Sequence, residues 1–368
     1  MESLLPRAAD ADKDASDLDS DLAAAIKSLC SLKFSDICMG PKAARMIFCA
    51  LQQTSSGLVN LDISDDNIPG WLSSLNKESM CLSLISSSSS KGFLNSLCVL
   101  NLRGNNLGKD DAEDLKYALL RMPSLRRLDI SDNPLTDDGI RSLSFSLSLY
   151  MVTSVGYHKS CCNCCRCLIP YFLEAFENSS LSDIKIENCS LSSSGVIQLL
   201  ENIQNLREPL HSLSLADNEL GSCMGVPLGK FLGASRVKEL NIEGVGLGPL
   251  GFQELESGMP GEVDLTYINV SKNRGRMKAA DFVSKIILQA PELHVINAGY
   301  NFIPSESLPV ICNALKHSKG KLERLDLTGN DQLSKQGPAS ALAEFCFQGK
   351  GIVVLPSLPS TAPYDDDP

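Results

Sequence analysis

Apolar side chains recur along this chain in a pattern of the form Leu-x-x-Leu-x-Leu-x-x-Asn-x-Leu, in which Ile, Val or Phe sometimes replaces Leu. Ten copies begin near residues 29, 58, 97, 125, 181, 210, 237, 265, 293 and 322. The central Leu-x-Leu alternates, which places both leucines on one face of a strand. Each copy therefore predicts one short strand, and Leu97–Leu107 and Leu125–Leu135 are two regular examples.

After each predicted strand, the apolar spacing changes to that of a helix. Strands stack about 4.8 Å apart, whereas neighbouring helices need about 8–10 Å, so a stack of strand–helix units must curve. We therefore predict an α/β solenoid shaped as a horseshoe, with parallel strands on the concave face and helices on the convex face. Two predicted helix faces are those of Ala112, Leu115, Ala118, Leu119 and Met122, and of Ala279, Phe282, Val283 and Ile286.

The ninth position of the pattern is polar in most copies. An Asn side chain carries both donors and an acceptor, so it can satisfy backbone groups in a buried turn. The position is occupied by Asn105, Asn133, Asn218, Asn273, Asn301 and Asn330, while Asp66, Cys189 and Val245 are weaker versions.

Most copies are 27 to 29 residues apart, but two intervals are longer. The interval of 39 residues after the second copy contains the serine run Ser86–Ser90, which predicts a polar insertion near 76–94. The interval of 56 residues after the fourth copy is twice 28, which predicts a degenerate, cysteine-rich repeat near 151–180. We therefore expect about eleven units, followed by a capping strand at Ile352–Leu355. A solenoid of this kind typically presents a long surface to another macromolecule.

The chain of 368 residues has a formal net charge of −11, with acidic runs at Asp10–Asp21 and Asp365–Asp367. These runs predict acidic disordered tails over residues 1–24 and 356–368, which leave the solenoid at 25–355. Direct nucleic-acid binding is disfavoured because phosphate contacts require a basic surface. No apolar run is long enough to span a membrane, and the fourteen cysteines follow no disulfide framework. A compartment that keeps thiols reduced, the nucleus or the cytoplasm, is therefore expected.

One cysteine cluster has the spacing of metal ligands. Overlapping Cys-x-x-Cys pairs lie within Cys161–Cys167, and His158 precedes them. A structural zinc site, however, normally uses two well-separated pairs of ligands, and here five cysteines crowd seven positions. An inserted loop, or a segment altered by splicing, is the favoured interpretation, and no metal site is assigned.

The chain offers little that predicts catalysis. Gly246-x-Gly248-x-x-Gly251 matches a dinucleotide fingerprint, but the strand before it is in register with the leucine pattern, and its glycines occupy the ordinary turn. His211 and His294 fall at the second position of their copies, where a side chain is exposed. We find no set of Ser, His and Asp that would converge. The prediction is a protein that is not an enzyme and has no cofactor.

Positions three, five and seven of each copy point into the concave face. Their acidic residues are concentrated at 183–243, beside Asn and Tyr side chains. Charged and aromatic groups on a rigid sheet are typical recognition anchors, so we predict that this surface binds a basic protein partner. Ordinary solvated strand residues are the competing interpretation. The predicted surface, called the acidic strand surface below, comprises Asp183, Glu187, Glu239, Asn241, Glu243, Tyr267, Asn269, Asn297 and Tyr300.

Over residues 25–355, the repeats resemble leucine-rich-repeat proteins of the ribonuclease-inhibitor-like type. Within that class, three stretches are similar to the C-terminal repeat region of the plant Tonsoku family. These stretches are Lys272–Lys285, Ala298–Leu308 and Lys319–Leu327. The resemblance implies a nuclear scaffold in genome maintenance, with roles in DNA replication and repair, chromatin and cell division.

Tonsoku proteins also carry an N-terminal tetratricopeptide array that recognises a histone, and residues 1–28 cannot supply one. The resemblance therefore implies a C-terminal piece, a short isoform or a truncated gene model. The alternative is a cytosolic ribonuclease-inhibitor-like or immune-receptor-type repeat module that binds or inhibits a protein target. Both interpretations predict a protein partner and no contact with a membrane.

Overall fold

The strands form one continuous sheet. The computed structural model describes residues 29–53, 57–71, 93–119, 122–139, 181–204, 209–259, 261–333 and 353–355, with single positions 73, 335, 337 and 342. Within these residues, eleven parallel strands lie side by side in chain order. They are β1 (Ser31–Lys33), β2 (Asn60–Asp62), β3 (Val99–Asn101), β4 (Arg127–Asp129), β5 (Asp183–Lys185), β6 (Ser212–Ser214), β7 (Glu239–Asn241), β8 (Tyr267–Asn269), β9 (Val295–Asn297), β10 (Arg324–Asp326) and β11 (Val353–Leu355).

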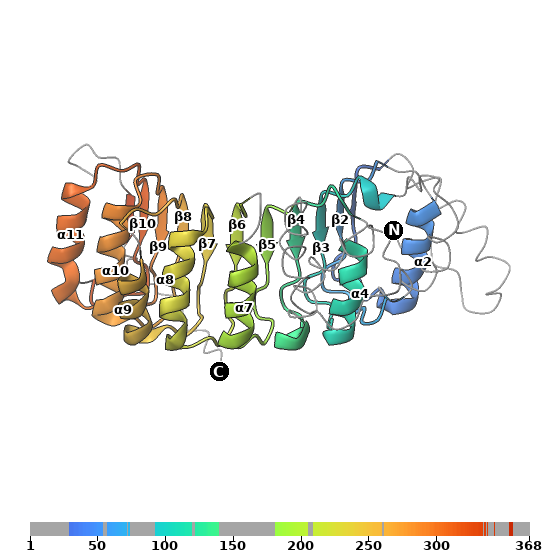
Figure 1. Ribbon diagram of the computed structural model, residues 1–368, viewed down its shortest axis with the longest axis horizontal. Coiled ribbons are helices and arrows are strands. Elements are labelled where there is room, and N and C mark those ends of the chain that lie inside the picture. The colour runs from blue at the N-terminus through green and yellow to red at the C-terminus, as the bar shows by residue number, and fades with distance from the viewer. Residues whose placement is uncertain are drawn as a thin grey trace, which may run out of the picture.

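Helices form a second layer on one side of this sheet (Figure 1). Each follows its strand along the chain and packs beside the helix of the next repeat, as α8 does against α9 and α9 against α10. The predicted α/β leucine-rich-repeat solenoid is therefore confirmed. The helices are α2 (Gly40–Gln53), α4 (Lys109–Leu119), α7 (Ser193–Gln204), α8 (Gly225–Ala234), α9 (Gly248–Gly258), α10 (Arg276–Gln289) and α11 (Leu308–His317), with short 3-10 turns η1 (Phe93–Asn95), η2 (Ser222–Met224) and η3 (Ser305–Ser307).

The strands pair in the register that the leucine pattern predicts. Position four of each copy lies beside position four of the next, as Leu240 does beside Ile268. The fifth positions line up in the same way, and Asn241, Asn269 and Asn297 are neighbours on successive strands. The predicted columns therefore exist as physical columns, although Ser214 and Asn269 of column five are buried.

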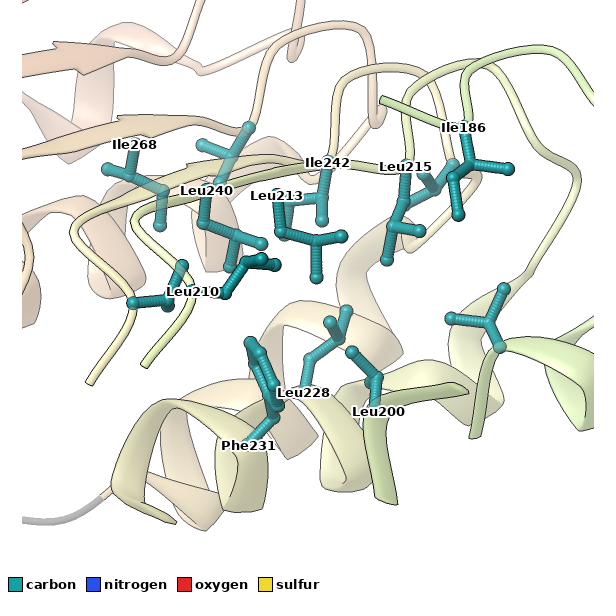
Figure 2. Close-up of a cluster of buried hydrophobic side chains, with 14 of the residues drawn as sticks. Ile186, Leu200, Leu210, Leu213, Leu215, Leu228, Phe231, Leu240, Ile242 and Ile268 are labelled. Atoms are coloured by element: carbon teal, nitrogen blue, oxygen red, sulfur yellow. The ribbon is translucent and has the colours of Figure 1, made fainter. Parts of the chain in front are cut away.

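The core lies between the two layers. Leu213 and Leu240 point down from the sheet toward Leu228 and Phe231 of α8 (Figure 2), and all four side chains are fully buried. Burying one side chain of this size contributes about 2 kcal/mol. The helix faces predicted from the sequence are buried too, except that Leu119 is only partly covered.

Strand β4 pairs directly with β5, so that Arg127 lies beside Asp183. The sheet therefore continues directly from β4 to β5, and the degenerate repeat predicted near 151–180 falls outside the described residues. The eleventh strand is β11, the predicted capping strand, which pairs with β10.

Several predictions fall outside the described residues. They are the acidic tails at 1–24 and 356–368, nearly all of the insertion near 76–94, and the cysteine-rich segment at 151–180 with His158 and Cys161–Cys167.

The buried Asn side chains link each repeat to the next. In Asn301, Nδ2 donates to the carbonyl oxygens of Val270, Ala298 and Gly299 at 2.9–3.2 Å. Its Oδ1 accepts the backbone N–H groups of Asn273 and Gly275, both at 3.2 Å. Such a side chain satisfies five backbone groups in a turn that no water reaches, as the sequence predicts.

Where the ninth residue is not Asn, other groups supply part of this bonding. The thiol of Cys189 donates to the carbonyl oxygens of Ile130 and Glu187 at 3.3 Å. Beside Val245, which has no polar side chain, the backbone N–H of Leu220 donates instead to the carbonyl oxygen of Val245 at 3.1 Å. The turn therefore keeps its shape although the side chain has changed.

Candidate functional site

The acidic strand surface lies mainly on β5, β7, β8 and β9, on the side of the sheet that the helices leave open (Figure 1). Its three Asn side chains also have a structural role. The Oδ1 atoms of Asn241, Asn269 and Asn297 each accept the backbone N–H two residues later, at 3.0–3.1 Å. Asx turns of this kind end the strands, and they explain why position five is so often Asn or Asp. Apolar spacing alone gives no sign of this role.

The amide groups of two Asn side chains hold the neighbouring acids. Nδ2 of Asn269 donates to Glu243 at 2.7 Å, and Nδ2 of Asn241 donates to Glu187 at 3.4 Å. Lys272 Nζ also lies 2.8 Å from Glu243. Partial burial raises the pKa of Glu243, but the hydrogen bonds from Lys272 and Asn269 outweigh it and hold that pKa below its usual value.

The other two acids of the surface also have partners. Asp183 lies 3.5 Å from Arg127 Nε, and Glu239 lies 3.6 Å from His211 Nε2. Exposed pairs like these contribute little to stability, and their charges remain accessible to a partner. The surface is therefore a set of acids held in place by neighbours, with less free negative charge than the sequence suggests.

One further acid, Asp217, lies close to the acids of this surface and is affected by their charges. Burial raises the pKa of Asp217, and the nearby charges of Glu243 and Glu187 raise it further against the opposing effect of Lys272. The local field is therefore negative at the carboxyl ends of β5 to β7, which favours a cationic ligand.

The two predicted tyrosines occupy different places. Tyr267 lies on β8 beside Glu239, and its pKa is raised by burial and by the charges of Glu243 and Glu239. Tyr300 lies beyond the end of β9, is 53% exposed, and has a positive φ of 51°. Its ring lies over Gly329, where a Cβ atom would come within 2.4 Å of it. The structure therefore separates Tyr300 from the other residues of the surface and places it at the edge of the sheet.

The glycines of the dinucleotide-like motif serve the repeat. Gly246 and Gly248 have positive φ values of 77° and 60°, which few other residues adopt. A Cβ atom on Gly251 would come within 3.1 Å of Leu247 and Ser222, so this glycine lets α9 approach the preceding repeat. Turn geometry and close packing account for the motif.

The side chains of the acidic strand surface offer charges and hydrogen-bonding groups to a ligand. In the described part of the chain, no group of three or more His, Cys, Asp or Glu side chains is placed to hold a metal ion. His211 and His294 are surface residues that face Glu239 and Glu323, as the sequence predicts. Among the described helices, none is long and apolar enough to cross a lipid bilayer.

Comparison with known proteins also identifies leucine-rich repeats. A family model described as Leucine Rich repeat matches residues 121–144. The chain is 25% identical to mouse NACHT, LRR and PYD domains-containing protein 3 over 81% of its length, and 24% identical to pig ribonuclease inhibitor over 68%. It is 26% identical to the zebrafish Tonsoku-like protein, again over 68%.

These matches involve only parts of the relatives. The chain spans 28% of the mouse protein, 48% of the ribonuclease inhibitor and 18% of the Tonsoku-like protein. Among solved structures, the leucine-rich-repeat protein LegL7 from Legionella pneumophila matches with 16% identity and a TM-score of 0.48, over 89% of this chain and 95% of that one.

Proposed function

Because this chain is a leucine-rich-repeat protein similar to ribonuclease inhibitor, we propose that it is a non-enzymatic scaffold that binds a protein partner through the open face of its sheet. The observation that carries the proposal is the column of acidic, amide and aromatic side chains along β5 to β8. Buried Asn residues and Asx turns hold this column in a fixed geometry. Such preorganisation lowers the entropic cost of binding.

The charge of the face supports a basic partner. Glu187 lies on the repeat of β5, and Glu239 and Glu243 lie on the repeat of β7, while Asp217 on the repeat of β6 between them adds a further charge at the edge. A Lys or Arg side chain of a partner would replace Arg127, His211 or Lys272 with little penalty, because these groups are themselves exposed. The proposed ligand is therefore a basic peptide or the basic face of a folded protein.

A reversal of charge tests this proposal. The full chain and a variant with Asp183→Lys, Glu187→Lys, Glu239→Lys and Glu243→Lys are used to capture proteins from cell extract, and each purified partner is then titrated against both. The partner's affinity should fall about ten-fold or more in the variant, since opposed charges are replaced by like charges.

The matched control reverses four exposed acids that are not part of the acidic strand surface, Glu219, Glu262, Glu306 and Asp331. Circular dichroism checks that both variants remain folded. Equal affinity of the partner for the chain and for the folded concave-face variant would remove the acidic strand surface from the proposal.

We further propose that the scaffold acts in the nucleus, in genome maintenance. The support is the likeness of Lys272–Lys285, Ala298–Leu308 and Lys319–Leu327 to the Tonsoku repeat region, together with the match to the zebrafish Tonsoku-like protein. The second candidate is an inhibitor or immune-receptor-type module in the cytoplasm, favoured by the matches to ribonuclease inhibitor and to the NACHT, LRR and PYD protein.

Proximity labelling in cells distinguishes the nuclear scaffold from the cytoplasmic inhibitor or immune-receptor-type module. Replication and chromatin proteins among the labelled neighbours would support the nuclear proposal. A set made only of cytoplasmic, secreted or membrane proteins would contradict it.

A further inference from the structure

A row of residues with positive φ runs along the edge of the sheet where the strands end. The eighth position of all ten leucine copies has a φ between 47° and 70°, and several tenth and twelfth positions share this geometry. In most copies these places hold Gly, Asp, Asn, Ser, Cys or Thr. Long or aromatic side chains occupy them only in the two copies that begin at Leu265 and Leu293, among the described residues. These side chains, called the edge platform below, are Lys272, Arg274, Arg276, Tyr300 and Phe302.

These residue types are not the ones that a left-handed backbone conformation favours. A left-handed conformation brings Cβ close to the following carbonyl oxygen, and Gly, Asn and Asp tolerate it best. The copy that begins at Leu97 uses Gly104 and Asn106 at the eighth and tenth positions. Five residues that tolerate the left-handed conformation poorly lie in these two adjacent loops. Because such backbone strain gathers at binding sites, their side chains are candidates for binding a ligand.

The edge platform is one surface. The backbone N–H of Lys272 donates to the carbonyl oxygen of Gly299 at 3.0 Å, which places Lys272 beside Tyr300. The N–H of Arg276 donates to the carbonyl oxygen of Asn301 at 2.8 Å, beside Phe302. These loops follow β8 and β9 at the ends of the strand arrows in Figure 1, and the buried Asn301 side chain holds both.

The platform is exposed and cationic. Tyr300 is 53% exposed and Phe302 60%, and Met277, which directly follows Arg276 in the first turn of α10, is 47% exposed. Lys272 is bonded to Glu243, whereas Arg274 and Arg276 form no ion pair within the described part of the chain. Large apolar side chains exposed next to unpaired guanidinium groups mark a recognition surface.

We propose that the edge platform binds an acidic peptide segment of a protein partner, one that carries an aromatic or large aliphatic side chain next to its carboxylates. Arg274 and Arg276 take the carboxylates, and Phe302, Tyr300 and Met277 receive the apolar side chain. A nucleic acid fits less well, because among the described residues the platform offers only two unpaired cations, too few for a continuing row of phosphates. The inference goes beyond the proposed function, since it concerns the edge of the sheet and a ligand of opposite charge.

Selection from random peptides displayed on phage tests the proposal. The full chain is the target, and a variant with Arg274→Glu and Arg276→Glu is the counter-target. Enriched peptides should combine Asp or Glu with Phe, Trp, Tyr or Leu. A synthetic peptide of the enriched sequence should bind the variant about ten-fold more weakly than the unchanged chain.

The charge-matched control is Lys230→Glu with Arg236→Glu, two exposed cations away from this edge. It should leave peptide affinity unchanged, as should a separate double variant with Asp183→Lys and Glu239→Lys alone. The platform and the proposed function therefore fail independently. Phe302→Asn is the most informative variant, because Asn tolerates the left-handed backbone conformation at position 302 better than Phe does. Its melting temperature should not fall, while the peptide should bind more weakly.

Three results would overturn the proposal. One is enrichment of basic peptides, or of none. Another is equal binding of the enriched peptide to the Arg274→Glu, Arg276→Glu variant. The third is tighter binding of single-stranded oligothymidine than of any peptide, lost in that same variant, which would assign the edge to nucleic acid.

Discussion

At the scale of single residues, position nine of the repeat decides how well a turn is held. Asp66 takes the place of Asn in the second copy, and it is 1% exposed. Its Oδ1 accepts the N–H groups of Ile37 and Met39, as an Asn would. Its Oδ2 is buried with no hydrogen-bond partner among the described residues, where the Nδ2 of an Asn would donate to carbonyl oxygens. A carboxylate is therefore a poor fit for this turn.

The first prediction is that Asp66→Asn stabilises the protein by about 1 kcal/mol, because the amide restores donors that the carboxylate lacks. Urea unfolding of both proteins measures the change. The converse substitution, Asn105→Asp, should destabilise the fold by about 1–3 kcal/mol, because it removes the donor to the carbonyl oxygens of Ile63 and Leu102. If Asp66→Asn lowered the midpoint, the account of position nine would be wrong.

Cysteine reactivity gives a second prediction. Burial raises the pKa of the Cys189 thiol to about 12, so at pH 8 it stays protonated and inside the turn. Iodoacetamide should modify the exposed Cys30, Cys38 and Cys223 of the native protein and leave Cys189 unmodified, as read by peptide mass spectrometry. In denaturant all four should react. Modification of native Cys189 at the rate of Cys223 would show that the turn is open.

The pair of Glu243 and Lys272 predicts a dependence on pH. Because the pKa of Glu243 is lower in the folded protein than its ordinary 4.5, ionisation of this group stabilises the fold above about pH 4.5, and that contribution is lost as the pH falls through the folded value. The stability gap between the protein and Glu243→Gln should therefore shrink on acidification. Urea unfolding at pH 7 and at lower pH measures it, and a gap that is constant with pH would contradict the assignment.

At the scale of elements, the leucine pattern predicts the strands, their register and the buried helix faces, because each depends only on periodicity. It does not predict that β5 pairs directly with β4, since an interval carries no information about which strand fills a sheet edge. The left-handed eighth positions are also invisible to a search for apolar spacing, although the recurrence of Asp, Asn and Gly there was a usable signal.

Direct pairing of β4 with β5 leads to a prediction about the intervening chain. Gly139 and Gly251 occupy the same position in their copies, so residues 140–180 can be replaced by a copy of residues 252–264 to give a unit of ordinary length. The chimera should fold with the same sheet and unfold in one cooperative step. Circular dichroism and urea unfolding report this. Loss of structure throughout the chain would mean that residues 140–180 are required for the fold.

At the scale of the whole molecule, the solenoid presents two surfaces of opposite character. The position of the acidic strand surface followed from the columns of the sequence, but the pairing of its acids did not, since contacts such as Glu243 with Lys272 depend on the turn after β8. The same turn places Tyr300 at the edge of the sheet with Arg274 and Phe302. A partner that combines a basic face with an acidic, apolar segment would match both surfaces.

The proposal for the whole molecule is that the open face of the sheet binds a protein through its acids. Its most direct test is a calorimetric titration of a purified captured partner into the full chain, the concave-face variant of four Lys substitutions, and the control reversed at Glu219, Glu262, Glu306 and Asp331. The affinity of the partner should be about ten-fold or more lower for the concave-face variant than for the full chain, and it should be unchanged for the control. Equal affinities for all three folded proteins would contradict it.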